Sequence, residues 1–271
     1  MSVKVSVILP TLNRLQLLKK SIKSVQEQSF REWELIIIDD ASDDGTSEYL
    51  NSLKDERIKY HRVALDGIPG ISKYLNYGIE NSSGEYIARL DDDDFWCDKN
   101  KLRKQVDFLN EHRDYVSVGG GIIMIDKNGK EIYKYLKREK DEDIRRHALS
   151  ANPFSHTTVM FRRDIAVKVG LYSMPYIEDW CLWLKMGKSG KFYNFPEYFT
   201  KYLSAGQNNS LKVQNDLSKQ ILKLIMEFRD FYPGYHRAYL LNYMQYLYSF
   251  LPLKIRSPLQ SRLYYIKRKF F

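Results

Sequence analysis

The 271-residue sequence lacks several features that would place it in a specialised class of protein. It has two cysteines, Cys97 and Cys181, too few for a disulfide framework, and neither has a Cys or His neighbour at metal-site spacing. We interpret both as packing residues. No secretory signal precedes the first strand-like run, so we expect a reducing, cytoplasmic setting.

Long hydrophobic runs are also missing. The best candidate, Ala238–Leu253, is interrupted by Asn242 and Gln245 and falls short of the ~20 apolar residues that a membrane span needs. Hydrophobic residues make up 44% and charged residues 28%, which is ordinary for a globular protein. The length suits one α/β domain with an appendage.

Acidic residues are absent from the C-terminal stretch Tyr232–Phe271. This stretch carries seven of the nine net positive charges and eight of the 21 tyrosines. Aromatic rings combined with cations are typical of a surface that meets anionic lipid, so we expect peripheral attachment to the inner face of the cell membrane. A helical cap or an oligomer interface is the alternative. Nucleic-acid binding is disfavoured because the sequence shows no recognised binding motif.

Strand and helix periodicities alternate along the N-terminal part of the chain. Right-handed βαβ units with a mostly parallel sheet, flanked by helices, are the predicted α/β fold. The predicted strands are 3–10, 33–39, 58–63 and 86–90, and the predicted helices are 14–29, 46–53, 70–83 and 101–111. Further on we expect a hairpin around 127–129, a strand at 157–161, helices at 164–169 and 179–187, and long helices after about 210.

Three polar loops follow predicted strands, and together they contain eight aspartates. They begin at Thr11, Asp39 and Asp91. In a parallel sheet these loops emerge at the same edge, the carboxyl ends of the strands, where open α/β sheets bind ligands. The sequence therefore predicts a ligand site at this edge.

The run Asp91–Asp94 is the strongest candidate for a metal site. On an extended segment Asp91 and Asp93 face the same way, and two hard carboxylates suit Mg²⁺ or Mn²⁺ bridging a diphosphate. Such a metal stabilises the charge on a departing nucleoside diphosphate. For Asp94 a helix N-terminus is the better interpretation, while Asp92 is a candidate for the donor ribose.

Other polar residues extend this candidate site. Asp39, followed by Asp40, ends an apolar strand where a carboxylate can accept from a base or a ribose, whereas Asp43 or Asp44 caps the next helix. Glu178 and Asp179 precede an amphipathic helix, and a carboxylate there can serve as general base or as a simple N-cap. Two further candidates are left open: His156 as a metal ligand, an acceptor contact or a core histidine, and Lys73 as a phosphate contact or part of a solvated helix face.

Taken together, these segments resemble family 2 glycosyltransferases of the GT-A fold, in particular those of bacterial surface polysaccharide assembly. The resemblance runs from Val3 to about Ser210. The segments that carry it are, in order, VSVILPTLNR, ELIIIDDASDDGT, GISKYLNYGI with GEYIARLDDDDFW, NPFSHTTVMFRRD, IEDWCLWLKM and YLSAGQNNS. Each is a weak signal alone, but their order makes the resemblance specific.

The resemblance implies a catalytic domain over 1–210, with a nucleotide-binding half at about 1–98 and an acceptor half at about 99–210, and a helical extension over 211–271. It implies an inverting, metal-dependent glycosyltransferase, a hexosyl- or N-acetylhexosaminyltransferase, that uses Mn²⁺ or Mg²⁺. The donor is a nucleotide sugar, with UDP-sugar favoured, and the acceptor is a glycan or lipid-linked, as in capsule or lipopolysaccharide synthesis.

The resemblance also assigns residue roles. Asp179 is the catalytic base, with Glu178 beside it. Asp93 and Asp91 form the DxD metal site, with His156 as a further candidate ligand. The nucleotide-sugar-binding candidates are Pro10, Thr11, Asn13, Arg14, Asp39, Asp40, Lys73, Asn76, Asp91 and Asp92.

The sequence departs from the family at Leu12, where an aromatic residue is common, and at Leu75, where arginine is common. Arg162 and Arg163 are then further candidates for phosphate contacts. A sugar nucleotidyltransferase is the alternative enzyme, but it predicts a glycine-rich loop after the first strand, which is absent. A non-catalytic glycan- or lipid-binding scaffold predicts a damaged acidic motif, whereas both motifs are intact.

Overall fold

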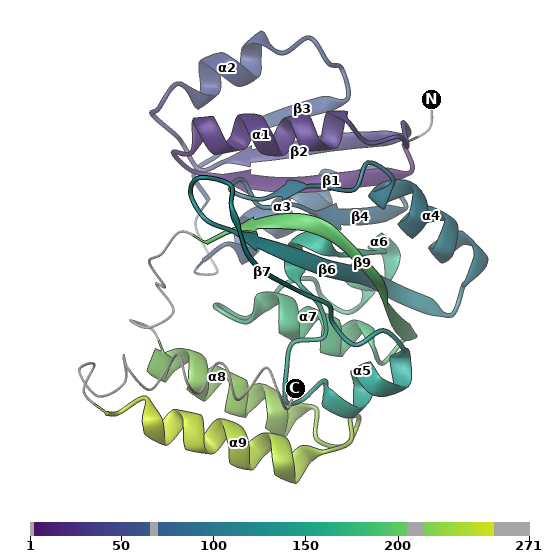
Figure 1. Ribbon diagram of the computed structural model, residues 1–271, viewed down its shortest axis with the longest axis vertical. Coiled ribbons are helices and arrows are strands. Elements are labelled where there is room, and N and C mark those ends of the chain that lie inside the picture. Colours follow the sequence, from purple (N-terminus) through teal and green to yellow (C-terminus); the bar gives the residue numbers. More distant parts are fainter. Residues whose placement is uncertain (1–2, 66–69, 205–213, 252–271) are drawn as a thin grey trace. The chain divides into compact units, whose positions relative to one another are not determined.

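Alternating strands and helices build the first half of the sheet in the computed structural model, which describes residues 3–65, 70–204 and 214–251 (Figure 1). All residues of β1, β2 and β4 are buried, as expected of parallel strands that are covered on both faces. The elements of this half are β1 Val5–Thr11, α1 Leu15–Gln26, β2 Trp33–Asp39, α2 Thr46–Ser52, β3 Ile58–Arg62, α3 Ser72–Glu80 and β4 Tyr86–Arg89.

These four strands pair in parallel in the order β3-β2-β1-β4. Thr11, the last residue of β1, is in register with Asp39, the last residue of β2. The loops that follow β1, β2 and β4 therefore leave the sheet at one edge, as predicted. This edge carries the candidate site.

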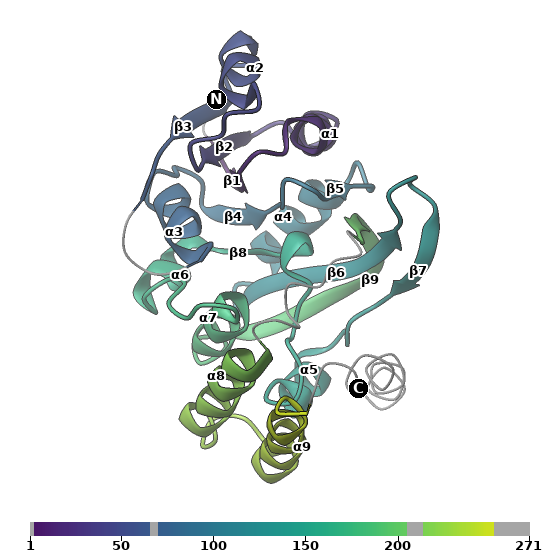
Figure 2. The same ribbon diagram turned by 90° about the vertical axis from the view of Figure 1, so that its left-hand side faces the viewer.

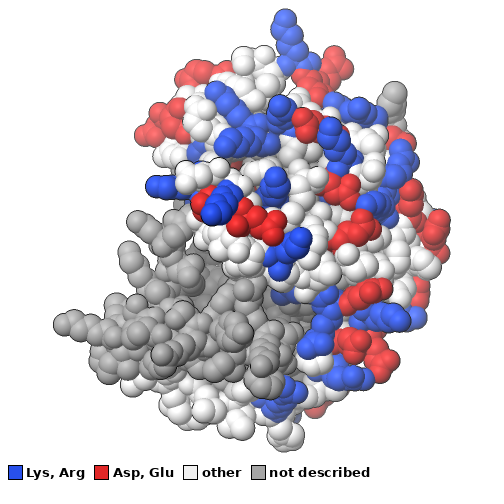
Figure 3. Space-filling view, viewed as in Figure 1, with Lys and Arg blue, Asp and Glu red and all other residues white. Residues whose placement is uncertain are grey.

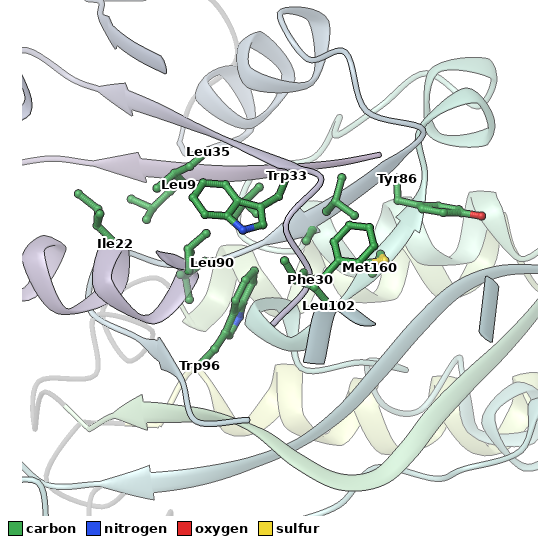
Figure 4. Packing of buried hydrophobic residues seen from close by; sticks show 14 of the residues in the cluster. Leu9, Ile22, Phe30, Trp33, Leu35, Tyr86, Leu90, Trp96, Leu102 and Met160 are labelled. Carbon is green, nitrogen blue, oxygen red and sulfur yellow. The ribbon is translucent and has the colours of Figure 1, made fainter. Parts of the chain in front are cut away.

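Helices cover both faces of the parallel half, as Figure 2 shows for α1 and α3. Leu18 and Ile22 of α1 pack in the main core cluster with Leu9 and Leu35 of the strands, part of which is drawn in Figure 4. On the opposite face Gly78 brings α3 so close to β1 that an added Cβ would lie 2.7 Å from the Ile8 methyl. This close approach requires glycine.

The second half of the sheet is mixed. From β4 the order continues β8-β6-β9-β5, with β7 paired to β6, and only β6 and β9 are parallel. The α/β class with flanking helices is confirmed, and parallel pairing dominates only the first half. The elements are β5 Phe95–Trp96, α4 Lys101–Glu111, β6 Tyr115–Ile125, β7 Glu131–Tyr135, η1 His156–Thr158, β8 Met160–Arg162, α6 Arg163–Lys168, α7 Glu178–Met186 and β9 Lys191–Leu203.

The predicted hairpin forms between β6 and β7, but the predicted strand 157–161 was wrong at its start. Thr157 and Thr158 belong to the 3₁₀ turn η1, because the Thr158 hydroxyl donates to the Ser155 carbonyl at 2.7 Å and closes the turn. Cys181 is buried as expected, whereas Cys97 is exposed.

The chain divides into two compact units, 1–140 with 154–205, and 141–153 with 206–271. In the second unit the described elements are α5 Asp141–His147, α8 Gln214–Glu227 and α9 Tyr235–Tyr248, of which α8 and α9 pack together. The expected division at about 210 stays a prediction. Within residues 3–65, 70–204 and 214–251, no helix is long and apolar enough to cross a membrane.

Candidate active site

The acidic run after β4 forms a turn, not the extended segment that we expected. The Asp94 N–H donates to the Asp91 carbonyl at 3.2 Å, which reverses the chain at Asp92 and Asp93. The side chains of Asp91 and Asp93 contact different arginines. Asp91 Oδ1 lies 2.5 Å from Arg89 Nη2, and Asp93 Oδ2 lies 2.6 Å from Arg14 Nη1.

Asp92 joins this turn to the loop after β1. Its Oδ2 accepts from the Thr11 hydroxyl at 2.8 Å and from the Leu12 N–H at 3.4 Å, while its Oδ1 lies 3.1 Å from Arg14 Nη1. Burial raises the pKa of both Asp92 and Asp93. The structure thus brings together Thr11, Arg14, Asp91, Asp92 and Asp93, with both Asp92 oxygens engaged by protein groups.

Asp94 points into the protein, and the expected role at a helix N-terminus is wrong. α4 begins only at Lys101, whereas Asp94 Oδ1 accepts from the Leu203 N–H at the end of β9. Burial, and then the Asp91 and Asp93 carboxylates, raise the pKa of Asp94 well above its usual value. Burial and the same three aspartates also raise the pKa of the nearby Tyr202 hydroxyl, a neighbour that sequence reasoning missed.

The loops after β1 and β2 are cross-linked. Asp39 is fully buried: its Oδ1 accepts from the Ser42 N–H at 3.0 Å and its Oδ2 from the Tyr60 hydroxyl at 2.9 Å. The Asn13 N–H donates to Ser42 Oγ and the Asn13 Oδ1 accepts from the Asp43 N–H, both at 2.9 Å. Asn13 adopts a left-handed backbone, φ 52°, to make both contacts. The two loops form one rigid rim.

Asp44, Pro10 and Asp40 complete this rim, and all three are engaged in the fold itself. Asp44 accepts from the first N–H groups of two helices, Leu15 at 2.8 Å and Thr46 at 3.2 Å, so the predicted cap is confirmed for Asp44. Pro10 is buried in β1, and the Asp40 N–H donates to the Thr11 carbonyl at 3.0 Å.

Two predicted donor contacts lie on α3. Lys73 Nζ donates to the Leu65 carbonyl and lies 5.0 Å from the centre of the Tyr74 ring. Both polar atoms of the Asn76 amide are occupied by the Tyr172 backbone: Nδ2 donates to the carbonyl at 2.8 Å and Oδ1 accepts from the N–H at 3.1 Å. Asn76 therefore fixes the segment before α7 against α3.

Glu178 and Asp179 form the first turn of α7 and share their surroundings with the acidic turn. Burial, and then the Asp179 carboxylate, raise the pKa of Glu178 to about 7, with Asp91 adding to the effect and Arg89 opposing it. Asp179 Oδ1 accepts from the Trp180 N–H at 2.7 Å. A carboxylate whose pKa is near neutrality, beside a second one, suits proton transfer at neutral pH.

His156 sits among aromatic rings. Its Nε2 lies 2.9 Å from the Tyr172 hydroxyl, and its ring centre lies 5.9 Å from that of Trp183. Burial, and then the Arg89 charge, lower the pKa of His156 well below its usual value. The partner of His156 Nε2 is thus a tyrosine hydroxyl and not a carboxylate of the acidic turn.

Arg89 is the central cation of the site, and sequence reasoning missed it. It is 1% exposed, and besides Asp91 its Nη1 donates to the Ile8 carbonyl at 3.3 Å. Its position at the end of β4, two residues before Asp91, was the available signal. Arg162 and Arg163 lie instead at the opposite edge, since Arg162 pairs with Tyr86 at the start of β4.

A divalent cation fits the donor set of the acidic turn. Asp91 and Asp93 supply hard carboxylate oxygens with side chains 29% and 23% exposed, and the repulsion between them adds to the raised pKa of Asp93. Across the described ranges, no three Asp, Glu, His or Cys side chains are arranged as a metal site. The predicted set of Asp93, Asp91 and His156 is therefore not assembled as such.

The sequence model described as "Glycosyl transferase family 2" matches residues 6–170. The putative glycosyltransferase EpsE of Bacillus subtilis is 34% identical to this chain, over 73% of the chain and 72% of EpsE. The GalNAc(5)-diNAcBac-PP-undecaprenol beta-1,3-glucosyltransferase of Campylobacter jejuni is 32% identical, over 70% of this chain and 62% of that protein.

Solved structures share the fold at low sequence identity. The mannosyltransferase PcManGT of Pyrobaculum calidifontis, in complex with GDP-Man and Mn²⁺, superposes with a TM-score of 0.67 at 17% identity, covering 100% of this chain and 83% of that one. TarS 1-349 of S. aureus, in complex with UDP-GlcNAc, gives a TM-score of 0.64 at 20% identity, covering 82% of this chain and 66% of that one. These likenesses confirm the GT-A type of α/β fold.

Proposed function

The chain belongs to glycosyl transferase family 2, and we propose that it is an inverting, metal-dependent enzyme. It transfers a sugar from a nucleotide-sugar donor to a glycan or lipid-linked acceptor. UDP-sugar is the favoured donor. The observation that carries the proposal is the sheet edge where the loops after β1, β2 and β4 meet, with Thr11 hydrogen-bonded to Asp92 of the acidic turn. Asp91 of this turn and Asp179 of α7 also both raise the pKa of Glu178.

The donor lies along the rim of the β1 and β2 loops. Pro10, Thr11 and Asn13 line the base pocket, and Asp39 accepts from the base. Asp39 already accepts from Ser42 and Tyr60, which orient its carboxylate, and a carboxylate retains further lone pairs. The remaining candidates around the donor are Arg14, Asp40, Lys73, Asn76 and Asp92. Asn76 contributes by holding the Tyr172 backbone.

Asp91 and Asp93 would hold Mn²⁺ or Mg²⁺, and a cation there would supply positive charge for the leaving diphosphate. Asp179 takes the proton from the acceptor hydroxyl, whose oxygen then attacks the anomeric carbon from the side opposite the leaving group. One such displacement inverts the configuration. The Asp179 carboxylate in turn raises the pKa of Glu178. His156 and Tyr172, in contact with one another, lie on the acceptor side.

Calorimetry tests the donor site. UDP is titrated into the full-length protein with Mn²⁺ and then with EDTA, for the wild type, Asp93→Asn and the exposed control Asp107→Asn. We expect binding that requires the metal, collapses in Asp93→Asn and survives in Asp107→Asn. If GDP or dTDP binds in place of UDP, the donor nucleotide is different but the proposed enzyme class stands. No nucleotide binding by folded protein would overturn the catalytic proposal and favour the scaffold alternative.

The acceptor, a glycan or lipid-linked, belongs to bacterial surface polysaccharide synthesis, and the undecaprenol-linked acceptor in the name of one relative supports the lipid-linked form. The second unit presents a matching surface. Leu240, Met244 and Leu247 share one face of α9 and are 59%, 61% and 52% exposed. The described residues in Figure 3 show basic and acidic side chains intermixed, whereas the sequence from 232 onwards is basic without acids. The apolar face of α9 and the basic sequence that follows it together dock on the anionic inner face of the membrane.

The part of the predicted basic tail beyond 251 lies outside the described residues.

Vesicle sedimentation tests this docking. The full chain should sediment with phosphatidylglycerol-containing vesicles and not with pure phosphatidylcholine vesicles. A triple Leu240→Ser, Met244→Ser, Leu247→Ser variant should lose the binding, while Val167→Ser, which removes an exposed apolar side chain elsewhere, should keep it. Equal sedimentation of all variants, or a shift of the wild type to a dimer that the triple variant abolishes, would overturn the membrane role.

A further inference from the structure

Two arginines act as counter-ions of the acidic turn, and they are held very differently. Arg89 is 1% exposed, and besides Asp91 it contacts the Ile8 and Leu90 carbonyls. The Arg14 side chain is 48% exposed, and among the described residues it pairs only with Asp92 and Asp93. Arg89 is therefore fixed in the strand, whereas Arg14 can leave its position by side-chain rotation.

Arg14 uses the oxygens that a cation would need. A single nitrogen, Nη1, lies 2.6 Å from Asp93 Oδ2 and 3.1 Å from Asp92 Oδ1. Asp93 is a proposed ligand of the divalent ion, and its Oδ2 cannot hold a guanidinium and a metal at the same short distance. The two positive charges also repel one another. Arg14 and the metal are thus competitors for this carboxylate.

The position of Arg14 in the chain limits where its guanidinium can lie after a metal displaces it. It immediately precedes α1, on the loop that follows β1, beside Asn13 of the nucleotide rim. A guanidinium released there would remain close to a diphosphate bound at the acidic turn. Its planar group of donors matches phosphate oxygens.

We propose that Arg14 is a resident counter-ion that a divalent cation displaces from Asp93 and that then binds the donor diphosphate. The proposal rests on the metal and donor site proposed above. Without a metal, Arg14 offsets part of the negative charge of the acidic turn. With metal and donor bound, Arg14 becomes a donor ligand, so that metal binding and diphosphate binding reinforce each other.

The exchange predicts effects of opposite sign from one substitution. In Arg14→Gln, Mn²⁺ alone should bind about three- to tenfold more tightly than in the wild type, the size of one or two exposed ion pairs. With Mn²⁺ saturating, UDP and inorganic pyrophosphate should each bind about tenfold more weakly, because a charged contact to phosphate is lost. Arg14→Lys should fall between the two, since it keeps the charge and loses the planar geometry.

The experiment is calorimetry on the full-length protein, first with Mn²⁺ alone and then with UDP or pyrophosphate at saturating Mn²⁺. Lys20→Gln is the matched control, because it removes one positive charge from the exposed side of α1. It should change neither affinity, and thermal melts should show all variants folded.

Each outcome decides between the proposals. If Arg14→Gln weakens binding of both Mn²⁺ and UDP, Arg14 only supports the turn. If it changes neither affinity, the Arg14–Asp93 ion pair has no role in binding. Both results overturn the exchange. If Lys20→Gln gives the same changes as Arg14→Gln, the effect is one of net charge, which also overturns it. In these cases wild-type binding leaves the proposed function standing. A folded wild type that binds neither Mn²⁺ nor UDP overturns both proposals.

Discussion

Asp94 Oδ1 accepts a hydrogen bond from the Leu203 N–H at 3.2 Å, so the acidic turn after β4 is tied directly to the last residue of β9. On the other side the Ser21 hydroxyl of α1 donates to the Asp94 carbonyl at 2.5 Å. Asp94 thus connects three elements that are distant in sequence. Its place is structural, while Asp91 and Asp93 beside it remain partly open to solvent.

Replacing Asp94 by Ala should destabilise the fold by about 1–3 kcal/mol, because the Leu203 N–H loses its partner. Asp94→Asn should cost less than about 1 kcal/mol, since its amide oxygen can accept the same bond and it resembles the protonated acid that the raised pKa favours. Urea unfolding of the two variants measures the difference. Equal losses in both would mean that the negative charge of Asp94, and not its hydrogen bond, is what the fold needs.

The sequence predicted best those elements whose hydrophobic pattern is local. β2 and α4 begin and end at the predicted residues. β9 escaped prediction because Pro196 interrupts its apolar pattern, and proline is rare inside strands. In the structure the register between β6 and β9 shifts between Gly119 and Gly121, opposite residues 194–198, which accommodates Pro196 in an irregular stretch.

The position of the site was predictable, but the partners within it were not. Strand polarity alone places Thr11, Asp39 and Asp91 at one edge. The pairing of Arg14 with Asp93, or of Asn76 with the Tyr172 backbone, depends on side chains that are 79 and 96 residues apart. No local pattern encodes such contacts. The turn at Asp92 was missed for the same reason, since its carboxylate is oriented by Thr11 from another strand.

Asp179→Asn should lower kcat by about 10²- to 10⁴-fold, the usual contribution of a general base. Binding of UDP with Mn²⁺ should remain near the wild-type value, because the proposed donor ligands are untouched. Radiolabelled transfer to an acceptor extract, together with calorimetry, separates the two effects. An Asp179→Asn variant with wild-type kcat would move the role of base to Glu178.

The same variant should shift the titration of Glu178. Its pKa of about 7 is raised by burial and then by the Asp179 carboxylate, so a neutral amide at 179 removes one repulsive charge and lowers the pKa of Glu178. Carbon-13 NMR of the glutamate carboxyls across pH 4–9 follows this shift, and Glu178→Gln identifies the signal. An unchanged pKa would show that burial alone raises it.

Gly78→Ala tests close packing against helix propensity. In a helix interior Ala is favoured over Gly by about 0.8–1 kcal/mol. Here the new Cβ would lie 2.7 Å from the Ile8 methyl and 2.8 Å from Ile38 Cδ1, and overpacking of a core costs about 1–3 kcal/mol. We expect net destabilisation in urea unfolding. The double variant Gly78→Ala, Ile38→Val, which removes the Ile38 Cδ1, should recover part of it, and additivity of the two changes would contradict the contact.

Lys101 should make the stability of the fold depend on pH on the alkaline side. It is fully buried, its Nζ donates to Gln105 Oε1 at 2.7 Å, and it lies 4.1 Å from the centre of the Trp96 ring. The ring favours the charged amine, but burial outweighs it and lowers the pKa of Lys101 well below its usual value. Between that lowered pKa and about 10.4, the unfolded chain binds a proton that the folded protein does not.

In that window the free energy of unfolding of the wild type should therefore rise with pH, by up to about 1.4 kcal/mol per pH unit for this one group. Lys101→Met keeps the apolar stem and removes the titrating amine. The difference in the free energy of unfolding between Lys101→Met and the wild type should therefore narrow or change sign from pH 7 to pH 9.5. Lys104→Met, on the same helix and partly exposed, is the matched control. Parallel stability curves for the wild type and Lys101→Met would show that the buried amine keeps its charge, stabilised by Trp96 and Gln105.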